Sequence, residues 1–205
     1  MPGSNSEHTS PIRPVHSSID IPSIFFSEAT GKMFEKCLVC EKELLQSQSD
    51  YVIEKAIKRY LSLNTTDTVF EYALCLECYA KQYKRISDES RRNLENYFAN
   101  NGDMMEQRYN FVLQNDFNVD TWIDRCIIKG KRNAECEEFQ IMCECRGGKM
   151  LFTYSPMMIS GEAVAEISER LSQKTKDDIG RFKDTYLNIP PELKINPRQP
   201  EPFLI

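Results

Sequence analysis

The chain of 205 residues has an ordinary hydrophobic fraction of 40% and a formal net charge of −5 at neutral pH. This size allows one compact body or two small ones, and the acidic balance gives no overall positive field that would collect nucleic acid or anionic lipid. No stretch approaches the roughly 18 consecutive apolar residues of a membrane-spanning helix, and the N-terminus lacks the pattern of a secretory leader. We therefore expect a cytoplasmic protein with no membrane partner, in which eight cysteines are more often metal ligands than disulfides.

Both ends of the chain are predicted to be tails. Residues 1–22 contain four prolines and many serines, with too little apolar content to offset the entropy of ordering. Residues 190–205 carry five prolines, which block helix and favour extended chain. Between the tails we expect a hairpin-helix module over residues 23–100 and a C-terminal α+β unit over residues 101–189.

The first of these units is predicted to be a β-hairpin followed by helix. Tyr51–Leu61 and Thr68–Leu74 alternate in hydrophobicity and are rich in β-branched and aromatic residues. Asn64–Asp67 are expected to form the turn between them. From Leu76 onward the apolar spacing changes to three and four residues, which is typical of a helix, and Ser87 is a candidate cap for a further helical segment.

The second unit is predicted to contain two helices, another hairpin and a helix pair. Helical periodicity covers Asp103–Leu113 and Val119–Ile128. Phe139–Cys145 and Met150–Tyr154 flank a Gly-Gly turn and form the hairpin. The helix pair begins at Ser160. No internal repeat is evident, since the two hairpin-then-helix units share only that order and no obvious spacing.

Two Cys-x-x-Cys pairs carry the clearest chemical signal. Cys37 and Cys40 form one pair, and Cys75 and Cys78 form the other after 34 intervening residues. Two residues between thiols let a tight turn direct both sulfurs at one ion, and two such turns supply the four soft ligands of tetrahedral zinc. Four thiolates leave no open position for water, so the sequence predicts one structural Zn²⁺ that stabilises the hairpin and helix.

The order of knuckle, hairpin and helix start over about residues 33–98 resembles a treble-clef zinc finger. The resemblance implies that all four cysteines are ligands, but it implies no particular task, because such modules serve many. We expect an α+β fold in which a treble-clef-like zinc knuckle, β-hairpin and helix join a C-terminal unit of helix, β-hairpin and helix pair. Phe70–Cys75, Ser155–Val164 and Pro190–Leu193 also resemble small uncharacterised bacterial proteins, which implies no activity.

The remaining four cysteines form a candidate second zinc site. Cys143 and Cys145 point to the same face of their predicted strand, Cys136 comes from the preceding loop and Cys126 from a helix end. Their spacing is irregular, and Cys126 lies in an apolar stretch where an inert core thiol is the simpler interpretation. Both alternatives stay open on the sequence.

Enzymatic alternatives have weaker support. A redox pair at Cys75 and Cys78 would use a thiol pKa lowered at a helix start, but no parallel βαβ pattern surrounds it. The two histidines of the chain, His8 and His16, fall in the predicted tail, so a nucleophile in the folded body has no obvious base.

Two surface features are candidates for binding. The most basic stretch could follow a phosphate backbone, and it consists of Lys81, Lys84, Arg85, Arg91 and Arg92. Acidic residues balance it within residues 33–100, so a solvated helix face is the simpler interpretation.

An apolar loop of Met157, Met158 and Ile159 would suit a protein partner if exposed, and would belong to the core if it packs under the following helix. We therefore predict a non-catalytic, zinc-stabilised protein-binding or adaptor module. A thiol redox or other enzyme and a nucleic-acid-binding zinc protein are the alternatives. Neither the partner nor the oligomeric state is indicated by the sequence.

Overall fold

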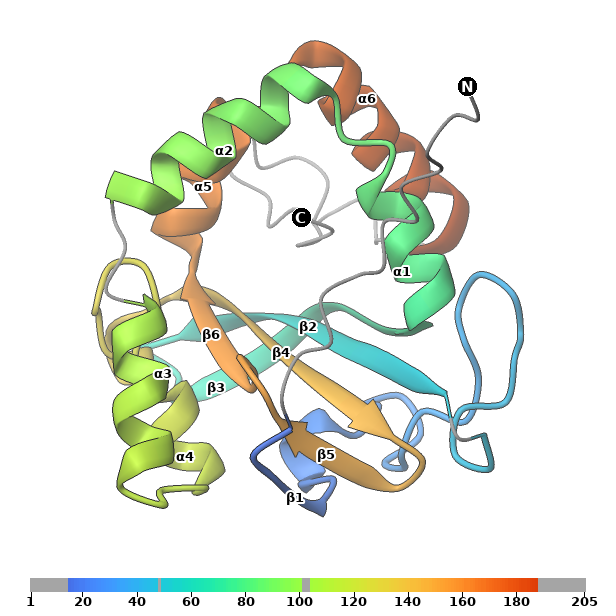
Figure 1. Cartoon of the computed structure of the whole chain (residues 1–205), viewed down its shortest axis with the longest axis vertical. Coiled ribbons are helices and arrows are strands. Elements are labelled where there is room, and N and C mark those ends of the chain that lie inside the picture. Colours follow the sequence, from blue (N-terminus) through green and yellow to red (C-terminus); the bar gives the residue numbers. More distant parts are fainter. Residues whose placement is uncertain (1–14, 48, 101–103, 188–205) are drawn as a thin grey trace, which may run out of the picture.

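A single antiparallel sheet runs through the centre of the computed structural model, which describes residues 15–47, 49–100 and 104–187. Its strand order is β1-β5-β4-β2-β3, with β6 also paired to β4 (Figure 1). The strands are β1 (Ser17–Asp20), β2 (Asp50–Tyr60), β3 (Thr65–Cys75), β4 (Glu138–Arg146), β5 (Lys149–Phe152) and β6 (Met157–Ser160). The helices are α1 (Leu76–Tyr83), α2 (Asp88–Asn100), α3 (Met104–Leu113), α4 (Val119–Ile123), α5 (Gly161–Glu169) and α6 (Gln173–Phe182). Two short 3-10 helices lie at Ser23–Phe25 and Asn133–Glu135, and a short π-helix lies at Lys183–Leu187.

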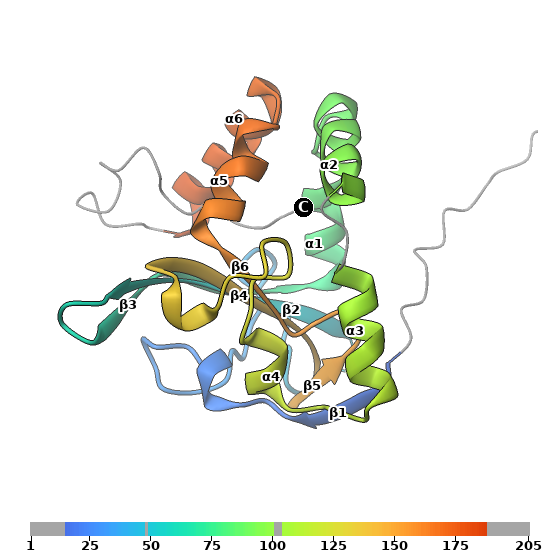
Figure 2. The same ribbon diagram turned by 90° about the vertical axis from the view of Figure 1, so that its left-hand side faces the viewer.

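Helices cover both faces of this sheet. Figures 1 and 2 show α1, α2, α5 and α6 on one side, and α3 and α4 on the other side with the N-terminal segment. The predicted α+β class is therefore confirmed. Within the described ranges, no helix is both long and apolar enough to cross a bilayer.

The predicted first hairpin is confirmed, with a different turn. β2 and β3 pair from Tyr51 with Cys75 to Tyr60 with Thr65, so the turn lies at residues 61–64 rather than at the expected 64–67. Asn64 has a φ of 49°, a left-handed conformation that asparagine tolerates better than most residues. The register places Cys75 at the end of β3, directly before α1.

Part of the predicted N-terminal tail belongs to the sheet. β1 lies within the predicted tail and pairs with β5, with Ile19 opposite Met150. Residues 1–14 and the predicted C-terminal tail, 190–205, lie outside the described residues. The predicted N-terminal tail therefore extends too far along the chain. Local composition does not reveal that this segment pairs with a distant strand.

Two predictions for the second half are wrong in detail. The expected helix Val119–Ile128 ends as α4 at Ile123, because Arg125 and Cys126 form bridges with Arg132 and Met158. The expected apolar loop is β6, in which Met157, Met158 and Ile159 are buried. These three residues therefore pack in the core, as the second of the two alternatives stated for them has it. They do not form a surface for a partner.

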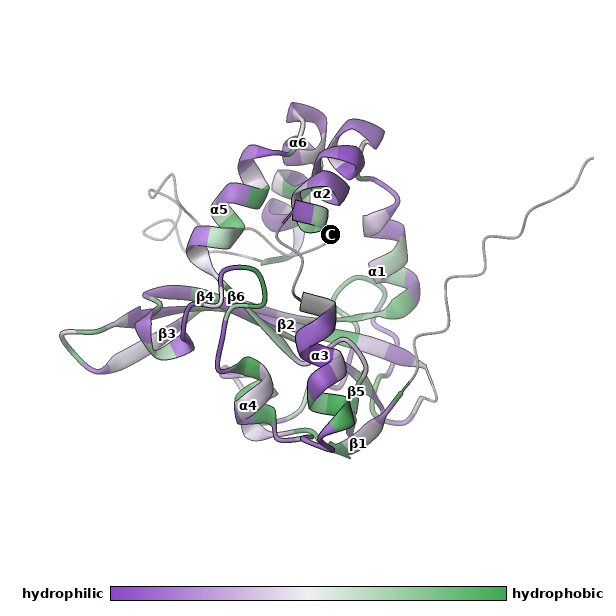
Figure 3. Ribbon diagram, turned by 60° about the vertical axis from the view of Figure 1, so that its left-hand side comes forward, coloured by the Kyte–Doolittle hydropathy of each residue, from purple (hydrophilic) through white to green (hydrophobic). Residues whose placement is uncertain are grey.

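The core fills the space on both sides of the sheet. Trp122 on α4 meets the Phe152 ring at 4.9 Å on one side, and Phe182 on α6 meets Tyr72 at 5.7 Å on the other. Figure 3 shows hydrophilic residues prevailing along α2 and α6, whereas hydrophobic residues are frequent on the strands and α4. Burial of apolar area on both faces at about 25 cal/mol per Å² is the main stabilising term for such a body.

Candidate metal centre

The first cysteine pair lies on a tight turn ahead of the hairpin. The backbone N–H of Cys37 donates to the carbonyl of Lys42 at 2.9 Å, and the carbonyl of Cys37 accepts from the N–H of Glu41 at 3.0 Å. Glu41 has a φ of 59°, and the residues that flank the turn form an antiparallel bridge. The turn presents the thiols of Cys37 and Cys40 from the same end.

The second pair lies where β3 gives way to α1. Cys75 is the last residue of β3 and the N-cap of α1, and Cys78 lies in the first helical turn. The N–H of Leu38 in the knuckle donates to the carbonyl of Ala73 in β3 at 2.9 Å. This backbone contact holds the knuckle against the strand that carries the second pair.

The four thiols converge as the sequence predicts. Their Sγ atoms all lie within 4.8 Å of one another, and those of Cys40 and Cys75 are 3.7 Å apart. A tetrahedral ion with metal–sulfur bonds of about 2.3 Å requires sulfur–sulfur separations of about 3.8 Å. Cys40 is exposed, whereas the other three thiols are buried. The four residues can therefore hold a metal ion.

The thiols differ in their local electrostatics. Burial opposes ionisation of Cys37, but backbone N–H groups of Cys40, Cys75 and Val39 directed at its sulfur outweigh burial and lower its pKa to about 7. Burial raises the pKa of Cys75 and of Cys78. A raised pKa disfavours the free thiolate that a redox pair at Cys75 and Cys78 would need. The convergence of four sulfurs, rather than these pKa shifts, is what favours metal ligation. None of the eight cysteines is in a disulfide.

The predicted second set of cysteines does not converge. Cys143 and Cys145 do share one face, with Sγ atoms 3.6 Å apart. However, the thiol of Cys136 donates to the carbonyl of Arg132, and the sulfur of Cys126 accepts from Ser160. Over the part of the chain that the structure describes, only the first set brings three or more such ligands together. Of the two alternatives that the sequence left open, the buried core thiol fits Cys126, which forms a bridge with Met158 and is 1% exposed.

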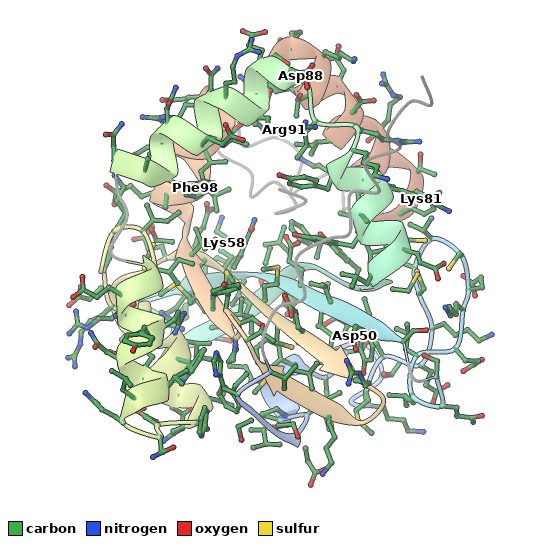
Figure 4. All side chains as sticks on the ribbon, viewed as in Figure 1. Asp50, Lys58, Lys81, Asp88, Arg91 and Phe98 are labelled. Carbon is green, nitrogen blue, oxygen red and sulfur yellow. The ribbon has the colours of Figure 1, made fainter. Side chains whose placement is uncertain are left out.

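The basic stretch does not form one phosphate-directed face. Figure 4 shows Lys81 on α1 well apart from Arg91 on α2. Arg91 is half-buried, donates to the carbonyl of Ile86 and pairs with Asp88 at 3.4 Å. The other members are exposed, and they are Lys81, Lys84, Arg85 and Arg92. This arrangement fits a solvated helix surface.

No protein-family model, no curated protein and no solved structure matches the chain. The fold and the four clustered cysteines therefore define the chain only by its class, which is an α+β protein with a candidate tetrathiolate metal centre.

Proposed function

We propose that the metal is a single structural Zn²⁺ held by Cys37, Cys40, Cys75 and Cys78. Four sulfurs that lie within 4.8 Å of one another are the ligand set that zinc prefers in closed, non-catalytic sites, where no coordination position remains for water or substrate. Zinc binding in small modules contributes on the order of 10 kcal/mol to folding. The ion would fasten the knuckle to the start of α1 in a metal-stabilised, cytoplasmic body.

The order of the elements supports a treble-clef-like unit. A knuckle precedes the β2–β3 hairpin, and the helix that follows supplies the last two ligands from its N-cap and first turn. This is the arrangement that the sequence resemblance implies. Because modules of this kind carry many different tasks, the function has to come from the surface that the module presents.

We propose that this surface is the tip of the β2–β3 hairpin and that the chain is a non-catalytic protein-binding module. β4 pairs with β2 only as far as Lys58, so the hairpin end projects beyond the rest of the sheet (Figure 2). At its tip Leu61 is 54% exposed and Leu63 is 72% exposed. Two leucines on a projecting hairpin are suited to enter an apolar pocket of a partner protein, since buried apolar anchors dominate most interfaces.

The test combines metal analysis with capture of the native partner. We expect one zinc ion per purified chain. We also expect Leu61→Ser with Leu63→Ser to abolish a specific protein complex that the wild-type chain forms in native lysate. Leu113→Ser is the matched control, because Leu113 is 61% exposed on α3 and lies outside the hairpin. Equal complex formation by all three proteins, each folded by circular dichroism, would exclude the hairpin tip as the contact surface.

A further inference from the structure

The strands and helices of the two halves follow the same plan. In the first half Tyr51 on β2 pairs with Cys75 at the end of β3, and Cys75 is the N-cap of α1. In the second half Phe139 on β4 pairs with Ser160 at the end of β6, and Ser160 is the N-cap of α5. Each helix is then followed by a second one, α2 or α6. β5 lies between β4 and β6 along the chain and has no equivalent between β2 and β3. The strand that enters each cap and its pairing register are nevertheless equivalent.

A loop in the second half has the backbone of the metal-binding knuckle. The N–H of Cys126 donates to the carbonyl of Lys131 at 2.8 Å, and its own carbonyl accepts from the N–H of Gly130 at 2.8 Å. These are the two hydrogen bonds that Cys37 makes within its own turn. The flanking residues again form an antiparallel bridge. Gly130 has a φ of 66°, and Glu41 has one of 59° at the matching position.

The two loops also dock on their strands in the same way. The N–H of Leu38, one residue after Cys37, donates to the carbonyl of Ala73 at 2.9 Å. The N–H of Ile127, one residue after Cys126, donates to the carbonyl of Met158 at 3.0 Å. Both acceptors lie two residues before the cap of the following helix. A loop that merely fills space would have no reason to reproduce this contact.

The two sulfurs accept the same backbone donor. The N–H of Cys75 approaches the sulfur of Cys37 at 3.4 Å, and the N–H of Ser160 approaches the sulfur of Cys126 at 3.3 Å. Cys126 is therefore the structural counterpart of Cys37. Neither the irregular spacing of the cysteines nor the apolar stretch around Cys126 indicates this equivalence.

A constant offset relates the helical parts of the two halves. Ser160 follows Cys75 by 85 residues, and the tripeptide Arg170-Leu171-Ser172 follows Arg85-Ile86-Ser87 by the same 85 residues. The agreement is confined to a few positions, and the second half lacks the paired cysteines that would make it visible.

The two helix pairs meet through reciprocal contacts. The N–H of Ser87 donates to the hydroxyl of Thr175 at 3.1 Å, and the N–H of Ser172 donates to the hydroxyl of Ser90 at 2.8 Å. The hydroxyls of Ser87 and Ser172 lie 2.8 Å apart. Such an exchange of equivalent contacts is the mark of a two-fold arrangement.

We infer that the chain is an internal duplication of one knuckle–hairpin–helix unit, and that its second unit contains a metal site that has lost its ligands. Cys126, Lys129, Ser160 and Ala163 occupy, in that order, the positions of the four cysteine ligands in the first unit. Only one of the four is a thiol, so the wild-type chain binds one ion and not two.

Hydrogen bonds take the place of the ion in the second unit. The hydroxyl of Ser160 donates to the sulfur of Cys126 at 3.3 Å and accepts from the N–H of Ala163 at 3.4 Å. The N–H of Lys129 approaches the same sulfur at 3.4 Å, and its ammonium group pairs with Glu166 on α5. A satisfied polar network of this kind holds the loop to the helix without metal.

Restoring the ligands tests the inference. We expect the triple variant Lys129→Cys, Ser160→Cys, Ala163→Cys to bind two Co²⁺ ions per chain, with twice the cobalt–thiolate absorption of the wild-type chain. The same three substitutions together with Cys126→Ala are the control, and this protein should lose most of the added absorption. A folded triple variant that still binds one ion would overturn the duplication of the site.

A milder variant covers the risk of misfolding. Lys129→Cys with Ser160→Cys leaves Ala163 in place and provides three thiols with Cys126, so a second Co²⁺ should bind more weakly. If both variants fail to fold, the inference is also wrong, because a loop with metal-site geometry should accept the ligands. Absence of metal from the wild-type chain would contradict the proposed zinc site, whereas one ion in both proteins contradicts only the duplication.

Discussion

Replacement of a metal ligand should remove the dependence of stability on zinc, and Cys78→Ser is the clearest case. Cys78 is buried in the first turn of α1 and belongs to the four-sulfur cluster. Cys143→Ser is the matched control, since Cys143 is fully buried and lies outside the four-sulfur cluster, with its sulfur 3.6 Å from that of Cys145. Both changes replace a buried thiol by a hydroxyl, so both cost stability, and only the response to zinc distinguishes them.

The expected size follows from linkage. A ligand that binds only the folded state at 1,000 times its dissociation constant stabilises that state by about 4 kcal/mol. For a body of this size each kcal/mol shifts the melting temperature by about 2–4 °C. We therefore expect zinc to raise the melting temperature of the wild-type chain and of Cys143→Ser by about 8–16 °C relative to excess chelator. Cys78→Ser should respond far less.

The single tryptophan makes the measurement direct. Trp122 is 1% exposed on α4, which lies away from α1 in Figure 1, so its emission reports unfolding of the whole body rather than local change at the metal. Melting curves would be recorded over a series of buffered free zinc concentrations. An equal zinc response in Cys78→Ser and the wild-type chain, or its loss in Cys143→Ser, would refute the ligand assignment.

Two further predictions concern contacts outside the metal centre. Burial opposes ionisation of Glu71, but the N–H of Glu28, the hydroxyl of Ser27 and the ammonium of Lys55 outweigh burial and lower its pKa. The stabilisation from Glu71 is therefore complete above its unfolded pKa of about 4.3 and is lost as the pH falls through the lower folded value. Glu71→Gln should cost about 1–3 kcal/mol in urea denaturation at neutral pH, and the difference from the wild-type chain should shrink on acidification; a constant difference would contradict the assignment. Ser160→Ala should cost about 1–2 kcal/mol by removing the cap of α5 and the hydrogen bond to a buried sulfur, and an unchanged urea midpoint would show that neither contact matters.

Local patterns were sufficient where an element depends on its own residues. Alternating hydrophobicity located β2 and β3, the Gly-Gly turn located β4 and β5, and Ser160 marked the start of α5. In the second hairpin the turn is determined locally because Gly147 takes a positive φ of 55°, which a two-residue connection of the primed type requires.

Elements that depend on a distant partner were missed. β1 is a strand because it pairs with the distant β5, and β6 is a strand because it pairs with β4 across the intervening β5. Their own composition resembles a tail and a loop. α4 ends early for the same reason, since Cys126 enters a bridge with Met158. Register and burial are non-local properties, so a short window of residues does not contain them.

The sequence by itself identified the four candidate metal ligands Cys37, Cys40, Cys75 and Cys78, because two thiol pairs at turn-compatible spacing suit one ion whatever surrounds them. The role of Cys126 was decided only by the tertiary structure. In the inferred duplication, Lys129, Ser160 and Ala163 stand where the first unit has Cys40, Cys75 and Cys78. Their side chains share no chemistry with those cysteines, so only their position on equivalent backbone reveals the relation. Side-chain identity carries information about ligands that are present, whereas hydrogen-bond geometry preserves the shape of a site after its ligands have changed.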